Sequence, residues 1–315
     1  MKKYRIDLGN VLLIHLIVIV AVIFLTKGIF GCSLDWLNQH VVLADEIRHA
    51  ILHAHSLFPD SVRTLMCGTN FYNLSYYGYL RPDVLVSCLF PNVPMYVFVA
   101  SYSILLLCAS GTFSYLFFRK VKLDAFYSIV LSSAVVLSSV FFHSHSQLMF
   151  INYMPFLFLA LFAVEKCKDT GKIWLLIFAE SMIMVHSYYY SVSAYFVIFV
   201  WSLYSVKQDK KELFKKIILS FFVTFLLTSV LTIPTVYVIL TNHKDVAKQS
   251  IFQILLPSLR LKGLLYNTYG CGLSYISWIL IVLGLSKKET RYLSLFLIIS
   301  FIFPVISWIL SGCLY

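Results

Sequence analysis

Long runs of apolar residues recur along this 315-residue chain, each near the length of a helix that crosses a membrane. A helix needs about 20 apolar residues to span the hydrocarbon core, and it satisfies its own backbone hydrogen bonds there. Hydrophobic residues make up 60% of the sequence and charged residues only 12%, which is about half the charged fraction of a soluble domain. We therefore predict an all-α polytopic membrane protein, with residues 1–315 forming a single transmembrane domain.

The apolar runs predict about nine transmembrane helices. The first run follows a basic start and lacks a small-residue cleavage site, so we expect an uncleaved span at 8–30. The others fall near 94–118, 124–142, 147–164, 173–189, 190–206, 216–240, 271–286 and 292–312. Residues 31–92 then form a large first loop, and residues 241–270 form a second one.

Basic residues cluster between alternate spans, and these clusters predict the orientation. Seventeen of the 25 lysines and arginines fall on the side that carries the N-terminus. The positive-inside rule makes that side cytoplasmic and places residues 31–92 outside the cell. The net charge of +11 therefore reflects topology rather than nucleic-acid binding. The short cytoplasmic loops carry no P-loop motif, so we expect no ATP site in this chain.

An acidic residue, Asp35, follows the first span by about one turn, at the start of the sequence DWLNQH. A carboxylate at the outer headgroup level can meet both a lipid-borne and a soluble substrate. It can also take the proton from an attacking hydroxyl group. The structural alternative is that Asp35 caps a helix beginning near Asn38, or is simply solvated.

Residues 38–58 show the apolar spacing of an amphipathic helix, which we expect to lie along the membrane surface. Asp45, His49 and His53 share its polar face at intervals of four residues. Such a set can hold zinc, but the spacing fixes no further ligand. We predict no metal site and interpret this stripe as a solvated face that contacts polar substrate.

Residues 67–83, with the sequence CGTNFYNLSYYGYLRPD, combine glycine, asparagine and many aromatic side chains. Aromatic faces stack on sugar rings, and amide or hydroxyl groups bond sugar hydroxyls. We predict a substrate-binding surface that includes His40 and five residues of this stretch: Asn70, Tyr72, Tyr76, Tyr77 and Arg81. The alternative is an aromatic belt at the membrane interface, which needs no ligand.

Further polar residues mark other outer positions. His143 and His145 lie between two spans beside hydroxyl residues, which favours a polar cavity, although a lone histidine is usually structural. Arg260 and Lys262, in the second large loop, are candidates for pairing with a lipid phosphate or with anionic headgroups. Glu180 falls within a span, where a buried acid is either functional or a protonated, hydrogen-bonded structural residue.

Several ordered motifs resemble the YfhO family of bacterial membrane proteins. In the first loop these are DWLNQH at 35–40, GTNFY at 68–72, SYY at 75–77 and LFP at 89–91. HSQLMFINYMPF at 145–156, SYYY at 187–190 and LTIPT at 231–235 extend the resemblance over essentially the whole chain.

This resemblance implies a GT-C-like fold and a GT-C-type glycosyltransferase. Such an enzyme moves a sugar from a polyprenyl-phosphate donor, such as undecaprenyl phosphate, to an extracytoplasmic acceptor. For this family the acceptor is typically lipoteichoic acid or another cell-wall polymer of Gram-positive bacteria. The resemblance implies a catalytic role for Asp35, and membrane lipids, donor and polymer as partners. It identifies no cofactor. Family members are usually longer, so we expect this chain to be a truncated form.

We hypothesise a direct displacement at the anomeric carbon with Asp35 as the base. Arg81, Arg260 or Lys262 would stabilise the charge of the departing phosphate. Two rival functions remain open. A transporter or flippase of lipid-linked sugars would need polar residues through the spans and internal repeats, and a non-catalytic membrane assembly or sensor protein would need neither.

Overall fold

The computed structural model describes residues 8–27, 30–32, 34–62, 68–138, 141–142, 145–205, 210–241, 256, 275–288, 290–303 and 305–306. These residues are almost entirely helical, with one two-stranded sheet among them. The chain divides into two compact units, Met1–Asn242 and His243–Tyr315. The all-α character predicted from the apolar runs is confirmed.

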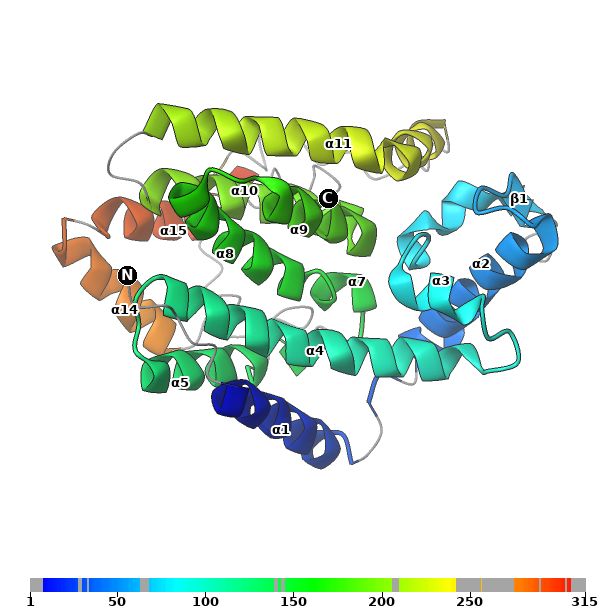
Figure 1. The fold of residues 1–315 in the computed structure, drawn as a ribbon, viewed down its shortest axis with the longest axis horizontal. Helices are drawn as coiled ribbons and strands as arrows, with labels where there is room; N and C mark the ends of the chain where they lie inside the picture. Colours follow the sequence, from blue (N-terminus) through cyan, green and yellow to red (C-terminus); the bar gives the residue numbers. More distant parts are fainter. Residues whose placement is uncertain are drawn as a thin grey trace. The chain divides into compact units, whose positions relative to one another are not determined.

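The first unit is built on a bundle of long helices that pack side by side (Figure 1). Its members are α4 (Met95–Lys120), α8 (Met154–Thr170), α9 (Trp174–His186), α10 (Tyr188–Ser205) and α11 (Lys210–Thr241). The helices α1 (Leu8–Leu25) and α5 (Ala125–Val136) pack against α4 on the opposite side from α8. Near the middle of this contact Gly111 lets Ile14 of α1 approach, because an added Cβ would lie 2.6 Å from the isoleucine Cγ2.

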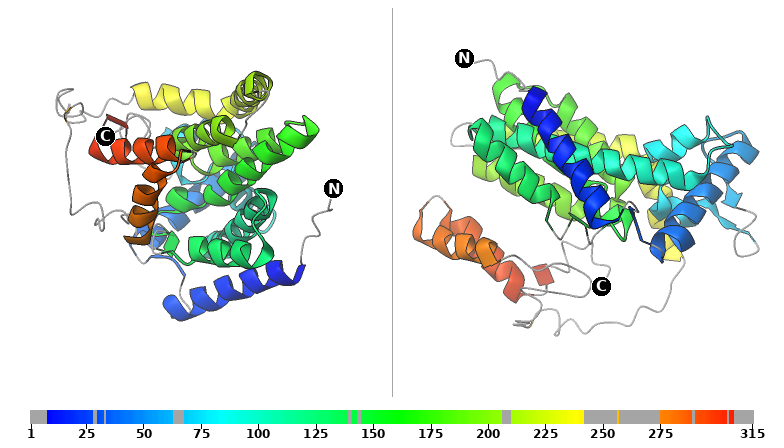
Figure 2. Two further views of the ribbon diagram at one scale, coloured as in Figure 1. Left: turned by 90° about the vertical axis from the view of Figure 1, so that its left-hand side faces the viewer. Right: turned by 90° about the horizontal axis from the view of Figure 1, so that it is seen from below.

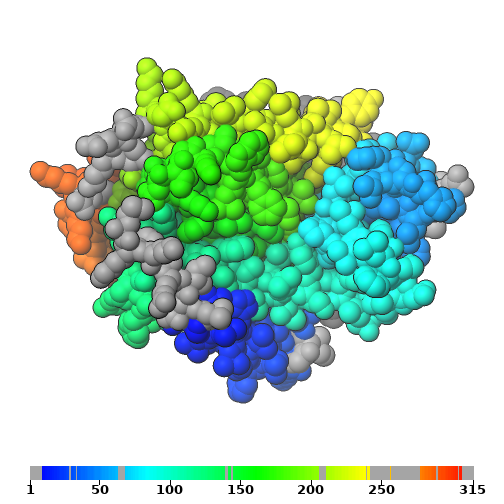
Figure 3. All heavy atoms as spheres, in the orientation of Figure 1, coloured from blue at the N-terminus to red at the C-terminus, as the bar shows by residue number. Residues whose placement is uncertain are grey.

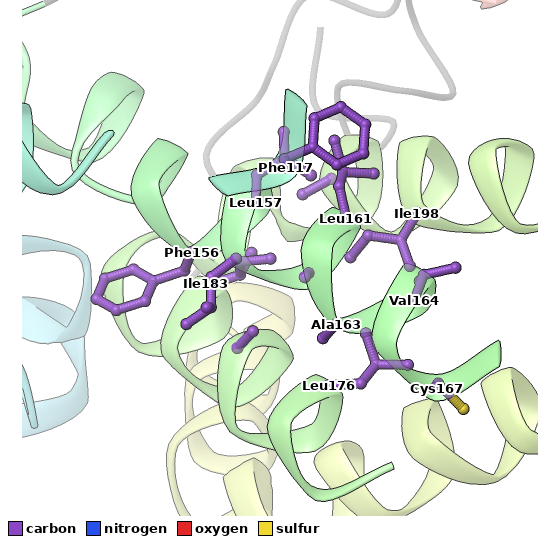
Figure 4. Packing of buried hydrophobic residues seen from close by; sticks show 14 of the residues in the cluster. Phe117, Phe156, Leu157, Leu161, Ala163, Val164, Cys167, Leu176, Ile183 and Ile198 are labelled. Carbon is purple, nitrogen blue, oxygen red and sulfur yellow. The ribbon is translucent and has the colours of Figure 1, made fainter. Parts of the chain in front are cut away.

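The core of the bundle forms around α8, whose apolar side chains meet those of its neighbours (Figure 4). Leu157, Leu161 and Val164 of α8 lie within this cluster and are nearly inaccessible. Phe117 of α4, Ile183 of α9 and Ile198 of α10 complete it. Close packing of these side chains, rather than intrinsic helix propensity, holds the helices in register.

The outer faces of the bundle are apolar, whereas small hydroxyl side chains lie inside it. On α1, Leu16 and Phe24 are 58% and 83% exposed, and α11 exposes Phe222 and Leu227 in the same way. Buried serines and threonines recur along α4, α5, α10 and α11. An apolar exterior around small polar residues is the arrangement of membrane helices.

Three helical segments among the described residues are long and apolar enough to cross a membrane. They are Met95–Lys120, Leu148–Thr170 and Lys211–Val238. Five shorter apolar helices accompany them, at Gly9–Leu25, Ala125–Val136, Trp174–His186, Ser277–Ser286 and Arg291–Ile302. A membrane protein is therefore supported, while the count of nine spans remains a prediction.

The first large loop folds into a small helical segment, which we call the outer segment (residues 34–94). It contains the π-helix η1 (Trp36–His40), α2 (Val41–Ala54), the strands β1 (Ser61–Val62) and β2 (Thr69–Asn70), the 3-10 helix η2 (Phe71–Tyr77) and α3 (Pro82–Ser87). The strands are antiparallel, with Ser61 opposite Asn70. The outer segment covers one end of the bundle (Figures 2 and 3).

The outer segment and the bundle share one apolar cluster. Trp36, Ile47 and Phe71 of the outer segment pack there with residues from the helix ends. These partners are Met95 and Val99 of α4, Leu148 of the short helix α7 (Leu148–Ile151) and Leu231 of α11. The predicted amphipathic helix at 38–58 thus appears as η1 and α2, with its apolar face against this cluster.

In the second unit, α14 (Tyr275–Ser286) and α15 (Arg291–Ile302) form an antiparallel pair. The rings of Trp278 and Phe301 contact each other at a tilted angle of 52°, with centroids 4.8 Å apart. At the other end of the pair, Thr290 Oγ1 donates a hydrogen bond to the carbonyl of Gly284 over 2.8 Å. The two helices also approach closely at Gly284, where an added Cβ would lie 2.2 Å from Oγ of Ser294 in α15.

Candidate functional site

Asp35 lies directly before η1, at the junction of α1 with the outer segment. It occupies the N-cap position, but its side chain makes no capping hydrogen bond. The carboxylate is partly buried, and its Oδ1 accepts a long hydrogen bond of 3.5 Å from Nε2 of Gln39. The structural alternative of a helix cap therefore does not explain this residue.

Trp36 fixes the position of Asp35 relative to the bundle. Its indole Nε1 donates a 2.6 Å hydrogen bond to the backbone carbonyl of His145. Gly31 lies under the indole ring, where an added Cβ would approach within 2.6 Å. Gly31 also has a φ of +122°, which a residue with a side chain rarely adopts. The turn after the first helix is thus built around a glycine and a tryptophan.

His40 ends η1 and is fully buried. Its Nε2 lies 2.9 Å from Oε1 of Gln147, which precedes α7. Burial lowers the pKa of His40 to about 4, although the bond to Gln147 and the charge of Asp35 oppose this shift. The imidazole is therefore neutral at physiological pH.

Tyr77 of η2 contacts both Gln39 and His40. Its hydroxyl donates to Oε1 of Gln39 over 3.4 Å, and its ring centroid lies 5.9 Å from that of His40. Burial raises the pKa of Tyr77, and the charge of Asp35 raises it further. Asp35, Gln39, Tyr77, His40 and Gln147 thus form a continuous polar set, which we call the Asp35 cluster.

A buried ion pair lies close to the Asp35 cluster. Arg81 is 3% exposed and Asp83 4% exposed. Arg81 binds the carboxylate bidentately, with Nε to Oδ1 at 2.6 Å and Nη2 to Oδ2 at 2.7 Å. The positive charge of Arg81 also acts on His40. Arg81 was predicted to bind substrate, and the structure places it inside the protein with its charge already paired.

Two bundle residues lie beside this ion pair and were not predicted as a unit. The hydroxyl of Tyr102 is 2.8 Å from Nε2 of His186, and the rings stack 5.7 Å apart. Nδ1 of His186 bonds the carbonyl of Met182 over 2.7 Å, so Nε2 accepts from the tyrosine. Both rings interact electrostatically with Arg81. No pattern local in the sequence links positions so far apart.

The aromatic residues of the predicted sugar surface divide into two groups. Tyr76 and Tyr77 meet edge to face at 5.3 Å, and Tyr76 also approaches Tyr188 of α10 at 6.0 Å. Tyr76 and Tyr188 therefore lie next to Tyr77, which belongs to the Asp35 cluster. Tyr72 instead packs edge to face with Tyr79 at 5.6 Å and with Phe71 at 5.9 Å, so it serves the apolar core of the outer segment.

Asn70 has a local structural role. Its Oδ1 accepts a 2.9 Å hydrogen bond from the backbone N–H of Tyr72 and so caps η2. Its side chain is otherwise exposed. An N-cap asparagine stabilises a helix by about 1 kcal/mol, which is a sufficient reason for the residue type at this position.

The remaining predicted residues are placed as follows. His145 is buried with its Nδ1 toward the carbonyl of Phe141, and burial lowers its pKa to about 4. Its backbone, rather than its ring, holds Trp36. His143, Arg260 and Lys262 lie outside the described residues.

The polar stripe of α2 forms ion pairs rather than a compact ligand set. Asp45 bonds Arg48 and lies 3.7 Å from Nε2 of His49. Within the described ranges, no three His, Cys, Asp or Glu side chains converge as metal ligands would. Arg48 is itself 4% exposed, and its Nη1 donates to the carbonyl of Val93 over 2.8 Å. Arg48 thereby ties α2 to the turn before α4.

Glu180 is fully buried between α9 and α11. Its Oε1 and Oε2 lie 3.0 Å from the hydroxyls of Ser220 and Thr224. Both hydroxyls also reach backbone carbonyls, at Ile217 and Ile177. They can therefore bond either form of the carboxyl group, which fits the interpretation of Glu180 as a hydrogen-bonded structural acid.

Comparison with known proteins agrees with this picture at the level of the family. A family model described as bacterial membrane protein YfhO matches residues 10–312, which is nearly the entire chain. No curated protein and no solved structure matches the chain.

Proposed function

Since the chain belongs to the YfhO family of bacterial membrane proteins, we propose that it is a GT-C-type membrane glycosyltransferase. The donor is a polyprenyl-phosphate sugar such as an undecaprenyl-phosphate sugar. The acceptor is an extracytoplasmic cell-wall polymer such as lipoteichoic acid. The transfer takes place outside the cell, where the outer segment lies in the proposed topology.

The observation that carries this proposal is the state of Asp35. The residue sits at the N-cap of η1, yet its carboxylate makes no capping bond and is only partly buried. Gln39 contacts one carboxylate oxygen at 3.5 Å. This carboxylate lies beside aromatic side chains at the end of an apolar bundle. A carboxylate in such a position can act as the general base for a hydroxyl nucleophile.

The proposed reaction is a single displacement at the anomeric carbon of the donor sugar. The acceptor hydroxyl oxygen forms a new bond to this carbon as the bond to the phosphate oxygen breaks. The bonding electrons leave with the polyprenyl phosphate. The proton of the acceptor hydroxyl passes to the carboxylate of Asp35.

The proposed substrate contacts rest on different kinds of support. His40 and Tyr77 belong to the Asp35 cluster and Tyr76 packs against Tyr77, so we assign the sugar or the acceptor to these three residues. Arg81 is fully paired with Asp83. We therefore propose that it contributes to the electrostatic potential at the site and does not bind phosphate directly. The phosphate-binding role of Arg260 and Lys262, and the pocket role of His143, rest on the sequence alone.

A matched pair of variants tests the role of Asp35 in a strain that lacks the chromosomal gene. Asp35→Asn keeps the size of the side chain and removes the basic oxygen. Asp60→Asn is the control, because Asp60 is an exposed acid of the same outer segment. We expect wild type and Asp60→Asn to restore the sugar on the wall polymer by mass analysis, and Asp35→Asn to restore less than about 1% of it. Normal decoration by Asp35→Asn at normal protein level would refute the assignment.

The proposal also requires the outer segment to face outside. Asp60→Cys places a thiol at an exposed position of that segment. We expect a membrane-impermeant maleimide to label this cysteine in intact cells. Labelling only after lysis would put Asp35 on the cytoplasmic side and exclude the proposed chemistry.

One observation favours a second candidate function, a transporter or flippase of lipid-linked sugars. Buried hydroxyl groups follow one face of α11 from Ser220 through Thr224 and Thr228 to Thr235, and Glu180 lies against the first two. Polar groups within spans are typical of transport paths. In the deletion strain, donor lipid trapped in the inner leaflet would support this alternative. Donor lipid accumulating in the outer leaflet would support the transferase.

A further inference from the structure

His40 differs from three other histidines that lie in or next to helices. In His15, His145 and His186 the ring Nδ1 bonds the backbone carbonyl four residues earlier. In His40 the equivalent carbonyl, that of Trp36, instead accepts the backbone N–H of Val41. The backbone of this turn is π-helical, and Nδ1 of His40 makes no bond to that carbonyl.

Nδ1 of His40 has no hydrogen-bond partner among the described residues, although the side chain is completely buried. An unpaired buried polar atom costs about 1 to 3 kcal/mol, so such an atom is usually explained by a ligand, an ion or water. The other ring nitrogen is fixed by Gln147 at 2.9 Å. The ring is thus held in one orientation with one unpaired nitrogen.

The surroundings of this nitrogen define the chemistry that would pair with it. The charges of Arg81 and Asp35 both act on the imidazole, and Tyr77 packs against it at 5.9 Å. Gln147 presents its carbonyl oxygen, so Nε2 carries the proton and Nδ1 offers a lone pair. The opposite amide orientation would turn Nδ1 into a donor. A hydroxyl group pairs with either form, because it both donates and accepts.

We propose that His40 is a substrate-binding residue of the Asp35 site, with Nδ1 hydrogen-bonded to a hydroxyl group of a saccharide substrate. Gln147 is the positioning residue that orients the ring. This inference rests on the proposed function. The hydroxyl belongs either to the donor sugar or to the acceptor polymer, and kinetics distinguish the two sources.

Two amide variants separate the two ring nitrogens. An asparagine amide reaches the place of Nδ1, whereas a glutamine amide reaches the place of Nε2 and can keep the bond to Gln147. Transfer is assayed with purified full-length protein, using the lipid extract of the deletion strain as donor and its undecorated polymer as acceptor. We expect kcat/KM of His40→Gln to be about tenfold or more below that of His40→Asn, as a lost substrate hydrogen bond predicts. Equal or higher activity of His40→Gln would overturn the proposal.

The Michaelis constants identify the source of the hydroxyl. A KM raised in His40→Gln for the lipid extract alone places the hydroxyl on the donor sugar. A KM raised for the polymer alone places it on the acceptor. If neither KM nor kcat changes, the proposal fails. Gln147→Glu keeps an oxygen for Nε2 and should retain most of the activity that Gln147→Leu loses, which a purely apolar packing role would not produce.

A measurement on the wild-type protein covers the case in which the amide variants do not fold. With ¹⁵N-labelled histidine in nanodiscs, we expect His40 to show the tautomer protonated at Nε2, and its Nδ1 resonance to shift when lipid extract or polymer is added. An Nδ1 resonance that responds to neither addition would overturn the inference. A separate result would refute the proposed function itself: deletion of the gene would leave every wall-polymer sugar in place.

Discussion

The hydroxyl oxygens of Thr235 in α11 and Ser75 in η2 lie 3.0 Å apart, within hydrogen-bond distance, although 160 positions separate the two residues. Both side chains are buried. Thr235 also bonds the carbonyl of Leu231 in its own helix over 2.6 Å. Ser75 in turn bonds the carbonyl of Tyr72 over 2.7 Å, so the contact joins the end of a bundle helix to the aromatic turn beside the Asp35 cluster.

Removal of this contact should weaken the docking of the outer segment. We expect Thr235→Val to lower the free energy of unfolding by about 1 kcal/mol, as the loss of one buried hydrogen bond predicts. Thr241→Val is the matched control, because exposed Thr241 bonds only carbonyls of its own helix. Thermal unfolding of both variants in detergent measures the difference. A double variant that adds Ser75→Ala should cost little more than Thr235→Val alone, and full additivity would deny the coupling.

We expect the buried Arg81–Asp83 ion pair to contribute far more to the stability of the protein than an exposed ion pair does. Arg81→Ala leaves a buried carboxylate unpaired, which costs about 3 to 5 kcal/mol, so we expect little folded protein in the membrane. Lys120→Ala is the comparison, because its partner Asp169 is 62% exposed and the expected cost is below about 1 kcal/mol. The double variant Arg81→Met with Asp83→Leu should recover part of the loss. Folded yield by fluorescence size exclusion reports all three, and equal yields of the two single variants would contradict the prediction.

Gly31 and Gly68 both have positive φ angles, of +122° and +99°, but differ in the space around them. An added Cβ at Gly31 meets the ring of Trp36, whereas among the described residues one at Gly68 finds only the Val62 carbonyl at 4.0 Å. We expect Gly68→Ala to lower the free energy of unfolding by about 1 kcal/mol because of backbone strain. Gly31→Ala should lower the free energy of unfolding by about 1 to 3 kcal/mol more, since the ring of Trp36 must move.

That movement would displace η1 and with it Asp35. We therefore expect Gly31→Ala to reduce sugar transfer more than Gly68→Ala at matched protein level in the membrane. Tryptophan fluorescence and the transfer assay check both parts. Equal behaviour of the two alanine variants would show that Trp36 does not depend on Gly31.

Acidification should destabilise the protein through its buried histidines. Burial lowers the pKa of His40 and of His145 from 6.5 to about 4. Between these values the unfolded chain binds a proton that the folded protein does not, so stability rises with pH over this window. The loss on going from pH 6.5 to pH 4 is about 3 kcal/mol for each histidine at most.

Melting temperatures at pH 7 and pH 5 test this linkage. We expect a clear fall at pH 5 in the wild type and a smaller fall in His40→Gln, which has no group to protonate. His53→Gln is the control for replacing a histidine of this segment by glutamine, because His53 is exposed. An unaltered pH dependence in His40→Gln would contradict the assignment of His40 as a buried neutral group.

The apolar runs located the bundle helices well where the sequence also marks their ends. The span expected at 94–118 corresponds to α4 (Met95–Lys120), which follows Pro94 and ends in basic residues. The span expected at 147–164 corresponds to the membrane-length segment Leu148–Thr170. Within it α7 ends at Ile151 and α8 starts at Met154, with Pro155 in its first turn. A proline in the first turn is a visible start signal, whereas apolar character alone does not reveal a break.

The candidate site was predictable only in its local parts. Asp35 and His40 share one short motif, and the four-residue step to Gln39 could have indicated its contact with Asp35. Gln147 could not be found in this way, because its contact with His40 spans 107 positions. For Arg81 the sequence shows the partner but not the burial. Its partner Asp83 is visible two residues later, but only the fold shows that both are buried.

The apolar cluster shared by the outer segment and the helix ends has a practical consequence. Trp36, Ile47 and Phe71 obtain part of their cover from Met95, Leu148 and Leu231, which belong to α4, α7 and α11. An excised peptide of this segment would present those surfaces to water and would be expected to aggregate. Antibodies or inhibitors against the outer segment should therefore be raised against the intact, lipid-embedded chain, because the epitopes of this segment exist only when the adjoining bundle is present.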